Sequence, residues 1–189
     1  MTIARSKPIA ECVSPREALG ELSRGFSGAE TLEFDCEEVT ADSMPLRSRE
    51  LLVHKKHMTR ILQEHYGRPV SVHVVERHHA EPSYGRKIFL TLEETTRVVQ
   101  YGLVRLDFRY MSTKVKTEIL GEGIPLGAVL INHNVLRRIE PRWFLRFPAG
   151  SPVLAWFNGQ SADPLYGRLG TIYCNHEPAI EVLEIVTGV

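Results

Sequence analysis

Glu184 is the residue whose position most strongly suggests chemistry. It lies in a run of alternating apolar residues near the end of the chain, a pattern that predicts a strand with one buried face. Burying a carboxylate without a partner is costly, so Glu184 should be paired or should face a ligand. An edge strand that leaves this side chain in water would produce the same pattern. The residues that share its predicted face are Ile180, Val182 and Val186.

Arg97 is the second candidate, at the start of a long β-rich run that extends to Thr117. By alternation it shares a face with Val99, Tyr101 and Leu103. Its planar guanidinium could hold a carboxylate through two parallel hydrogen bonds. The simpler alternative is an arginine at a strand end that reaches solvent.

The segment Leu120–Gly127 holds three glycines and one proline within eight residues. Glycine permits positive φ and close approach of the backbone to a ligand. Because an apolar helical pattern follows, the segment could present backbone N–H groups to a ligand at the start of a helix. An ordinary turn would need the same composition.

The eight histidines raise the question of a metal site. His54 and His57 are three residues apart, and His78 and His79 are adjacent. No HExxH or Cys/His signature accompanies them, and no GxSxG, Walker A or GxGxxG motif is present. Solvated surface positions explain the histidines better, so we do not expect a metal site.

Apolar residues at helical spacing predict the helices that would position these groups. One short helix is expected around Leu46–Leu52. A second spans Met58–Tyr66, with Thr59 as a possible N-cap and Gly67 as its C-terminal stop. A third follows the glycine-rich segment, over Leu126–Leu130.

Alternating residues predict an antiparallel sheet, and hence a single α+β domain with flanking helices. We expect a polar loop over His78–Lys87, and a hairpin over Arg97–Thr117 that turns near Val104–Asp107. A further loop is expected over Pro148–Pro164, which is rich in glycine, serine and proline. The other predicted strands are Pro69–Glu76, Tyr166–Cys174 and Ala179–Val186, the last two joined as a hairpin.

Length and composition set the broad class. The chain has 189 residues, enough for one globular domain, which we place at 46–189 after a partly irregular N-terminal arm at 1–45. Lys plus Arg and Asp plus Glu are both 23, so a nucleic-acid partner is not expected. Neither a signal peptide nor an apolar run of membrane-spanning length is present, and three scattered cysteines do not indicate a disulfide framework. These observations favour a cytoplasmic protein.

Several stretches together resemble the chorismate lyase family, also called 4-hydroxybenzoate synthase or chorismate pyruvate-lyase. The resemblance covers about residues 45 to 187, and its specific part is the order and spacing of loose motifs. The segment between Gly121 and Pro125 is one residue longer than in the family pattern. The stretches that carry it are Met58-Thr59-Arg60 with Pro69–Val72, Arg97, Leu120–Gly127, and Tyr166-Gly167-Arg168 followed by Pro178 and Glu184.

The resemblance implies cleavage of chorismate to 4-hydroxybenzoate and pyruvate in a buried site without a cofactor, as a step of aromatic acid biosynthesis. Arg97 would bind the ring carboxylate, aided by the backbone at Leu126 and Gly127. Glu184 would lie near the C4 oxygen as an acid or hydrogen-bond partner, and Met58 would belong to an apolar lid.

Three alternatives remain open. The first is a non-catalytic domain of the same fold that binds an aromatic acid as a sensor, as in some bacterial transcription regulators. The second is a related lyase that acts on another enolpyruvyl or aromatic acid. The third is a purely structural interaction protein. In the first two cases the expected partner is a small molecule.

Overall fold

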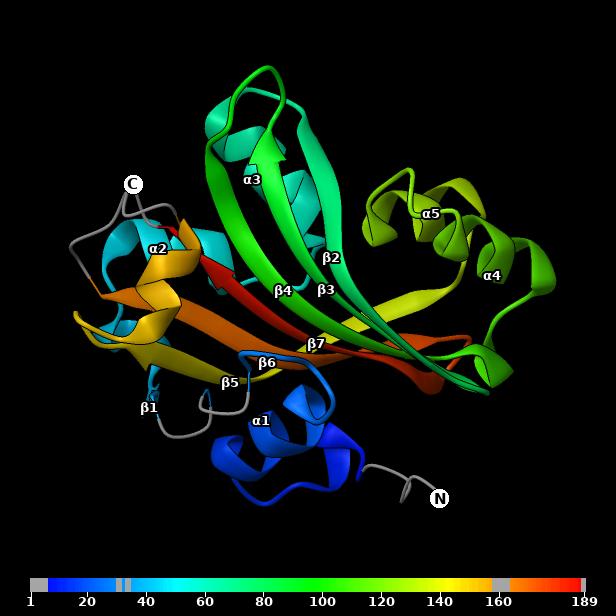
Figure 1. The fold of residues 1–189 in the computed structure, drawn as a ribbon, viewed down its shortest axis with the longest axis horizontal. Coiled ribbons are helices and arrows are strands. Elements are labelled where there is room, and N and C mark those ends of the chain that lie inside the picture. Colours follow the sequence, from blue (N-terminus) through cyan, green and yellow to red (C-terminus); the bar gives the residue numbers. More distant parts are fainter. Residues whose placement is uncertain (1–6, 30–31, 33–34, 158–163, 188–189) are drawn as a thin grey trace.

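The computed structural model describes residues 7–29, 32, 35–157 and 164–187. Its centre is a seven-stranded antiparallel sheet in the order β1-β5-β6-β7-β4-β3-β2 (Figure 1). This arrangement confirms the predicted α+β class. The strands are β1 (Glu37–Val39), β2 (Val70–Ala80), β3 (Ser83–Leu92), β4 (Val98–Asp107), β5 (Arg137–Phe147), β6 (Leu165–Cys174) and β7 (Glu177–Val186).

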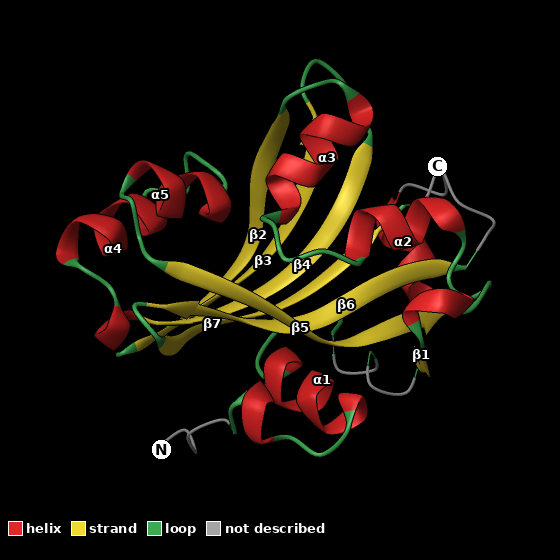
Figure 2. Ribbon diagram, turned by 180° about the vertical axis from the view of Figure 1, so that it is seen from behind, coloured by secondary structure: helices red, strands yellow, loops and turns green. Residues whose placement is uncertain are grey.

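Helices cover both faces of the sheet. Figure 2 shows α2 to α5 on one face, which we call the helix face, and α1 on the other, which we call the arm face. The α-helices are α1 (Pro15–Ser23), α2 (Leu46–Leu52), α3 (Met58–Tyr66), α4 (Thr113–Leu120) and α5 (Leu126–Asn132). The short 3-10 helices are η1 (Ile9–Glu11), η2 (Ala41–Ser43), η3 (Phe108–Tyr110) and η4 (Pro152–Phe157).

Apolar side chains fill the space on each side of the sheet. On the arm face, Leu19 and Leu22 of α1 pack with Leu103 of β4 and Leu183 of β7 in one buried cluster. On the helix face, two further clusters lie under α2 and α3 and under α4 and α5. The central strands are therefore buried on both faces, which explains the nearly continuous burial along β4, β6 and β7.

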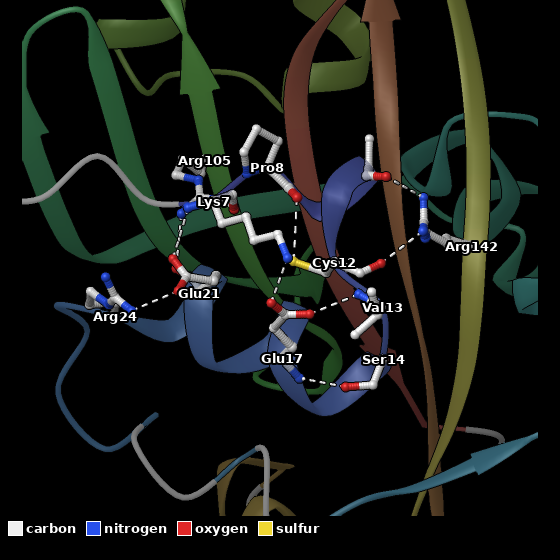
Figure 3. A network of polar contacts seen from close by, with 11 residues as sticks. Lys7, Pro8, Cys12, Val13, Ser14, Glu17, Glu21, Arg24, Arg105 and Arg142 are labelled. Atoms are coloured by element: carbon white, nitrogen blue, oxygen red, sulfur yellow. Dashed lines mark hydrogen bonds and ion pairs between the residues drawn. The ribbon is translucent and has the colours of Figure 1, made fainter.

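A polar network fastens the N-terminal arm to the sheet (Figure 3). Arg105 of β4 donates to the backbone oxygens of Lys7 and Glu21, at 3.0 and 2.9 Å, and pairs with Glu181 of β7. Glu181 also accepts a hydrogen bond from the backbone N–H of Ile9. Arg142 of β5 donates to the backbone oxygens of Ala10 and Cys12. The described part of the arm is thus packed and hydrogen-bonded, and the boundary at residue 45 stays a prediction.

Most of the predicted elements are present where the periodicity placed them. Helices α2, α3 and α5 and the hairpin of β6 and β7 are confirmed. Helix α3 ends at Gly67, whose left-handed conformation has φ 63°, as expected of a glycine stop. The predicted N-cap Thr59 is wrong, because α3 begins one residue earlier and His57 precedes it.

Two predicted elements are replaced by others. Strand β4 continues to Asp107, and the second half of the expected hairpin is helix α4, whose N-cap Ser112 accepts from the N–H of Val115. The expected loop His78–Lys87 is largely the paired ends of β2 and β3, which meet at a tight turn. Its polar composition reflects β2, an edge strand with many exposed side chains. Residues 158–163 of the predicted loop Pro148–Pro164 lie outside the described residues.

Among the described residues, no helix has the length and apolar character needed to cross a membrane.

Candidate ligand-binding site

A small cavity of about 40 Å³ lies between the helix face and the N-terminal ends of two helices. Its floor comes from β3, β4, β6 and β7, and its roof from residues 57–59 at the start of α3 and 125–127 at the start of α5. Four residues predicted from the sequence line this cavity together: Met58, Leu126, Gly127 and Glu184. Sequence positions that are far apart therefore converge as the resemblance implied.

Arg97 does not line the cavity. It precedes β4, and its guanidinium carbon lies 5.2 Å from the ring centroid of Tyr66 in α3. A register shift in the β3–β4 pairing interrupts the simple alternation on which its predicted face depended. Tyr101 and Leu103, expected on the same face as Arg97, pack in the cluster of the arm face, opposite the cavity. Arg97 as a substrate-binding or catalytic residue stays a prediction that this geometry does not favour.

Glu184 is paired rather than exposed. Strand β7 lies between β6 and β4, and Glu184 stands opposite Arg168 in the β6–β7 register. The Nε of Arg168 donates to Glu184 Oε2 at 2.6 Å. Arg168, which is only 2% exposed, also donates to the backbone oxygens of Leu52, His54 and Lys56, and so holds the α2–α3 connection against the sheet. Glu184 is therefore paired on a central strand, and the alternative of an edge strand that leaves it in water is excluded.

Arg86 is the functional candidate that sequence reasoning missed. It lies in β3 opposite Val104 and is 0% exposed. Arg86 is not among the residues that line the cavity, but it shares the helix face with Ile88, which does line it, two residues on. Within the described part of the chain, none of its three guanidinium nitrogens has a hydrogen-bond partner. Burial lowers the pKa of Arg86. In the sequence, the alternation of Tyr84, Arg86, Ile88 and Leu90 could have indicated a strand with Arg86 on its buried face. We predicted a loop over His78–Lys87 and so did not recognise this pattern.

Gln100 and Gly102 lie two positions apart in β4, next to residues of β3 that line the cavity. Gln100 lines the cavity, is 3% exposed, and its Oε1 has no hydrogen-bond partner among the described residues. Gly102 stands opposite both Ile88 and Glu184 in the sheet. A Cβ at Gly102 would lie 3.0 Å from Ile88 Cγ1 and 3.4 Å from Gln100 Nε2. The missing side chain therefore leaves space between β3 and β7.

His57 forms part of the roof. It is 8% exposed, and its Nε2 accepts a hydrogen bond from the Nε of Arg137 in β5. Burial lowers the pKa of His57 to about 4, with smaller contributions in the same direction from Arg137 and Arg168 and an opposing one from Glu184. The imidazole is accordingly neutral at physiological pH.

The glycine-rich segment closes the side of the site near β2 and β3. Glu122, in a left-handed conformation with φ 54°, accepts hydrogen bonds from Arg77 Nε at 2.9 Å and from the Tyr84 hydroxyl at 2.6 Å. The hydrogen bond from Arg77 lowers the pKa of Glu122. Burial, together with the hydrogen bond to Glu122, raises the pKa of Tyr84 to about 12. The segment connects α4 to α5, not a strand to α5 as the sequence suggested.

In the described parts of the chain, no group of three or more histidine, cysteine, aspartate or glutamate side chains is arranged to hold a metal ion. The cavity is lined mainly by apolar side chains, with His57, Thr59, Gln100 and Glu184 as the polar ones.

No protein-family model and no curated protein matches the sequence. Among solved structures, it is similar to PhnF from Mycobacterium smegmatis, with 12% identity, a TM-score of 0.49, and coverage of 92% of this chain and 79% of that one. The effector domain of the same protein gives a TM-score of 0.48 at 12% identity, over 70% and 89% of the two chains. The ligand-binding domain of a GntR-family transcriptional regulator from Bordetella bronchiseptica gives 0.47 at 14%, over 62% and 85%.

Proposed function

We propose that this protein binds a small organic acid in the cavity of the helix face, without transforming it, and that Arg86 holds the anionic group. The observation that carries the proposal is the guanidinium of Arg86, fully buried and without a hydrogen-bond partner among the described residues. A buried cation without a partner costs several kcal/mol. An anionic ligand would supply the missing acceptors in a bidentate geometry.

The size of the cavity bears on how such a ligand would enter. A volume of about 40 Å³ is far below the roughly 300–1,000 Å³ of typical ligand pockets. Binding therefore requires the roof to move away from the sheet. The roof consists of two helix ends and the connections that precede them, Met58 among them, and such elements shift more readily than the strands below.

Binding without turnover is favoured by the state of Glu184. Its Oε2 is engaged by Arg168, so the carboxylate is suited to accept a hydrogen bond rather than to donate a proton. Chorismate lyase activity is the second candidate, because Glu184, Leu126, Gly127 and Met58 line one cavity as the family resemblance implies. In that case Arg86, and not Arg97, would take the ring carboxylate.

Calorimetric titration with 4-hydroxybenzoate tests the proposal, using Arg86→Met and the matched control Arg97→Met. Loss of a charge-assisted contact should weaken binding by about 10- to 100-fold in Arg86→Met and leave it nearly unchanged in Arg97→Met. Equal loss in both variants, or loss in Arg97→Met alone, would exclude Arg86 as the anchor.

Incubation of the wild-type protein with chorismate decides between binding and catalysis. We expect no 4-hydroxybenzoate or pyruvate above the uncatalysed rate by chromatography. Stoichiometric formation of both products, lost in Glu184→Gln, would establish the lyase instead.

A further inference from the structure

We infer that a second site, on the arm face of the sheet, binds an organic ammonium ion with an aromatic body. The inference is independent of the proposed function, because this site lies on the opposite face of the sheet from Arg86 and takes a ligand of the opposite charge. We call it the arm-face groove. It is lined by His73, Phe89, Thr91, Thr95, Thr96, Val98, Ala155 and Trp156, and at one end by Ser71, Leu92, Glu93 and Glu94.

The groove lies over β2 and β3. Phe89 packs against the buried cluster of the arm face, and Thr91, two residues on, shares that face. His73 stands opposite Phe89 in the β2–β3 register, and its Nε2 is hydrogen-bonded to the hydroxyl of Thr91 at 2.8 Å. Phe89 and Trp156 border the cluster and are only partly buried. Two large aromatic rings therefore remain accessible on this part of the sheet.

A buried ring holds these two aromatic side chains in place. Trp156 of η4 stacks on Tyr101 of β4, with ring centroids 4.2 Å apart and 25° between the planes. Phe89 meets the same tyrosine edge to face at 5.5 Å. Tyr101 is 1% exposed, so its position is fixed by the core. A rigid aromatic surface binds a ligand at low entropic cost, because little freedom is lost on binding.

The groove is large enough to take a small molecule without rearrangement. It consists of two adjoining hollows of about 500 Å³ each, which share His73, Thr91, Thr95 and Thr96. This size is within the roughly 300–1,000 Å³ of typical ligand pockets. The cavity of the helix face, by contrast, has about 40 Å³. A ligand of the arm-face groove can therefore bind to the structure as it stands.

The charges at the groove favour a cation. No lysine or arginine is among the described residues that line either hollow, whereas Glu93 and Glu94 both border one end. Neither carboxylate takes part in an ion pair within the described part of the chain. Arg97, which follows them in the chain, lies over the Tyr66 ring of α3 instead. The groove thus presents negative charge beside aromatic rings, which attracts a cation and repels an acid.

The neighbouring surface does not reverse this charge. Lys87 lines the adjoining hollow near Phe89 and Trp156, but its ammonium group pairs with Glu76 at 2.6 Å and donates to the backbone oxygen of Ser27. An ammonium group over an aromatic face is stabilised by the ring quadrupole, and nearby carboxylates add to this attraction. The ligand class that matches both features is an aromatic amine in its protonated form.

The two tryptophans of the chain allow a test that reports on the groove itself. In ¹H–¹⁵N spectra of the intact labelled protein, Trp143 and Trp156 each give an indole N–H signal, which the spectrum of Trp143→Phe assigns. Trp143 lies in β5, which β6, β7 and β4 separate from β3, so it serves as an internal control. The probes are tryptamine, tryptophol and indole-3-acetate, which share one ring and carry positive, zero and negative charge.

We expect tryptamine to shift the Trp156 signal saturably and to leave that of Trp143 in place. Tryptophol should bind about threefold to tenfold more weakly, and indole-3-acetate more weakly still. The double variant Glu93→Gln with Glu94→Gln should bring tryptamine to within about twofold of tryptophol. The matched control is Glu38→Gln, an exposed carboxylate on β1 at the opposite edge of the sheet, which should keep the wild-type preference.

Three results would overturn the inference. They are a Trp156 signal that no probe moves at millimolar concentration, equal affinity for tryptamine and tryptophol, and an unchanged preference in the double variant. Arg86→Met should leave tryptamine binding as in wild type, because that residue lies on the other face. The outcome at the arm-face groove is therefore separate from the outcome for the organic acid in the cavity of the helix face.

Discussion

Arg86 and Arg105 lie on neighbouring strands, one position out of register, and their side chains leave the sheet on opposite faces. Arg105 stands opposite Gly85, and Arg86 opposite Val104. On the arm face, Arg105 pairs with Glu181 and donates to two backbone oxygens. On the helix face, Arg86 has no hydrogen-bond partner among the described residues. The same residue type is thus hydrogen-bonded within the protein on one side of the sheet and, among the described residues, without a hydrogen-bond partner on the other.

The first prediction follows from this contrast. Arg86→Met removes an unpaired buried charge and should raise the free energy of unfolding by about 1–4 kcal/mol. Arg105→Met leaves Glu181 buried without its partner and should lower the free energy of unfolding by about 3–5 kcal/mol. Urea denaturation at pH 7 measures both. A loss of stability in Arg86→Met comparable to that in Arg105→Met would mean that Arg86 is a structural residue.

The second prediction concerns the floor of the cavity. Gly102→Ala places a methyl group 3.0 Å from Ile88 Cγ1, a flexible side chain that can shift. Stability should change by less than about 1 kcal/mol, because the lower backbone entropy of the unfolded state offsets the crowding. Binding of 4-hydroxybenzoate should weaken by about tenfold, because the space is filled.

Gly123→Ala is the matched control for that change, since its Cβ would meet only the Gly121 backbone oxygen at 3.9 Å. Calorimetric titration of both variants with 4-hydroxybenzoate compares their affinities. Wild-type affinity in Gly102→Ala would show that the ligand does not occupy the space over β4.

The third prediction is a pH dependence of stability from His57. Its folded pKa of about 4 is below the unfolded value near 6.5, so between these values the unfolded state binds more protons. The contribution of His57 is complete above pH 6.5 and is lost as the pH falls toward 4, by roughly 3 kcal/mol in total. The charged groups that face the ring are Arg137, Arg168 and Glu184.

Denaturation of wild type and His57→Gln between pH 4 and 7 isolates the contribution of His57 to stability, because the other titrating groups are common to both proteins. The wild-type stability should decline more steeply on acidification. Parallel curves would show that the ring is not held neutral by its surroundings.

The fourth prediction separates the two members of the Arg168–Glu184 pair. Arg168→Met removes the donor to three backbone oxygens in the α2–α3 connection and leaves Glu184 unpaired, so it should cost about 3–5 kcal/mol. Glu184→Gln keeps an acceptor for Arg168 and should cost less than about 1.5 kcal/mol. Thermal unfolding monitored by circular dichroism compares them. Equal losses would contradict the role of Arg168 as the residue that holds the connection.

Local sequence patterns were sufficient to predict several helices and strands. The amphipathic spacing and glycine stop of α3, the glycine-rich approach to α5, and the alternation in β6 and β7 each produced the expected element. Four of the five predicted site residues, Met58, Leu126, Gly127 and Glu184, line one cavity, and each lies within such an element; their roles stay predictions.

The errors have both local and long-range causes. Residues 113–120 have β-rich composition but form α4, because Val115 and Ile119 share one buried helical face and Ser112 caps the helix start. Strand β3 was hidden by the polar edge strand that pairs with it. The resemblance placed Arg97 in the site, but the alternation grouped it with Tyr101 and Leu103, which pack on the arm face, and the register shift between β3 and β4 interrupts that alternation.

The sequence by itself determined the α+β class, the helices at the roof and the apolar face that carries Glu184, because these depend on periodicities within a single segment. Only the tertiary structure decided which arginine is buried on the helix face, which partner Glu184 has, and which residue contacts His57. Each of these depends on a strand register or a contact between residues 16 to 80 positions apart, such as Arg168 with Glu184 and Arg137 with His57. Register across a sheet is set jointly by the hydrophobic patterns of both paired strands and by the turn between them, so one strand taken alone does not determine it.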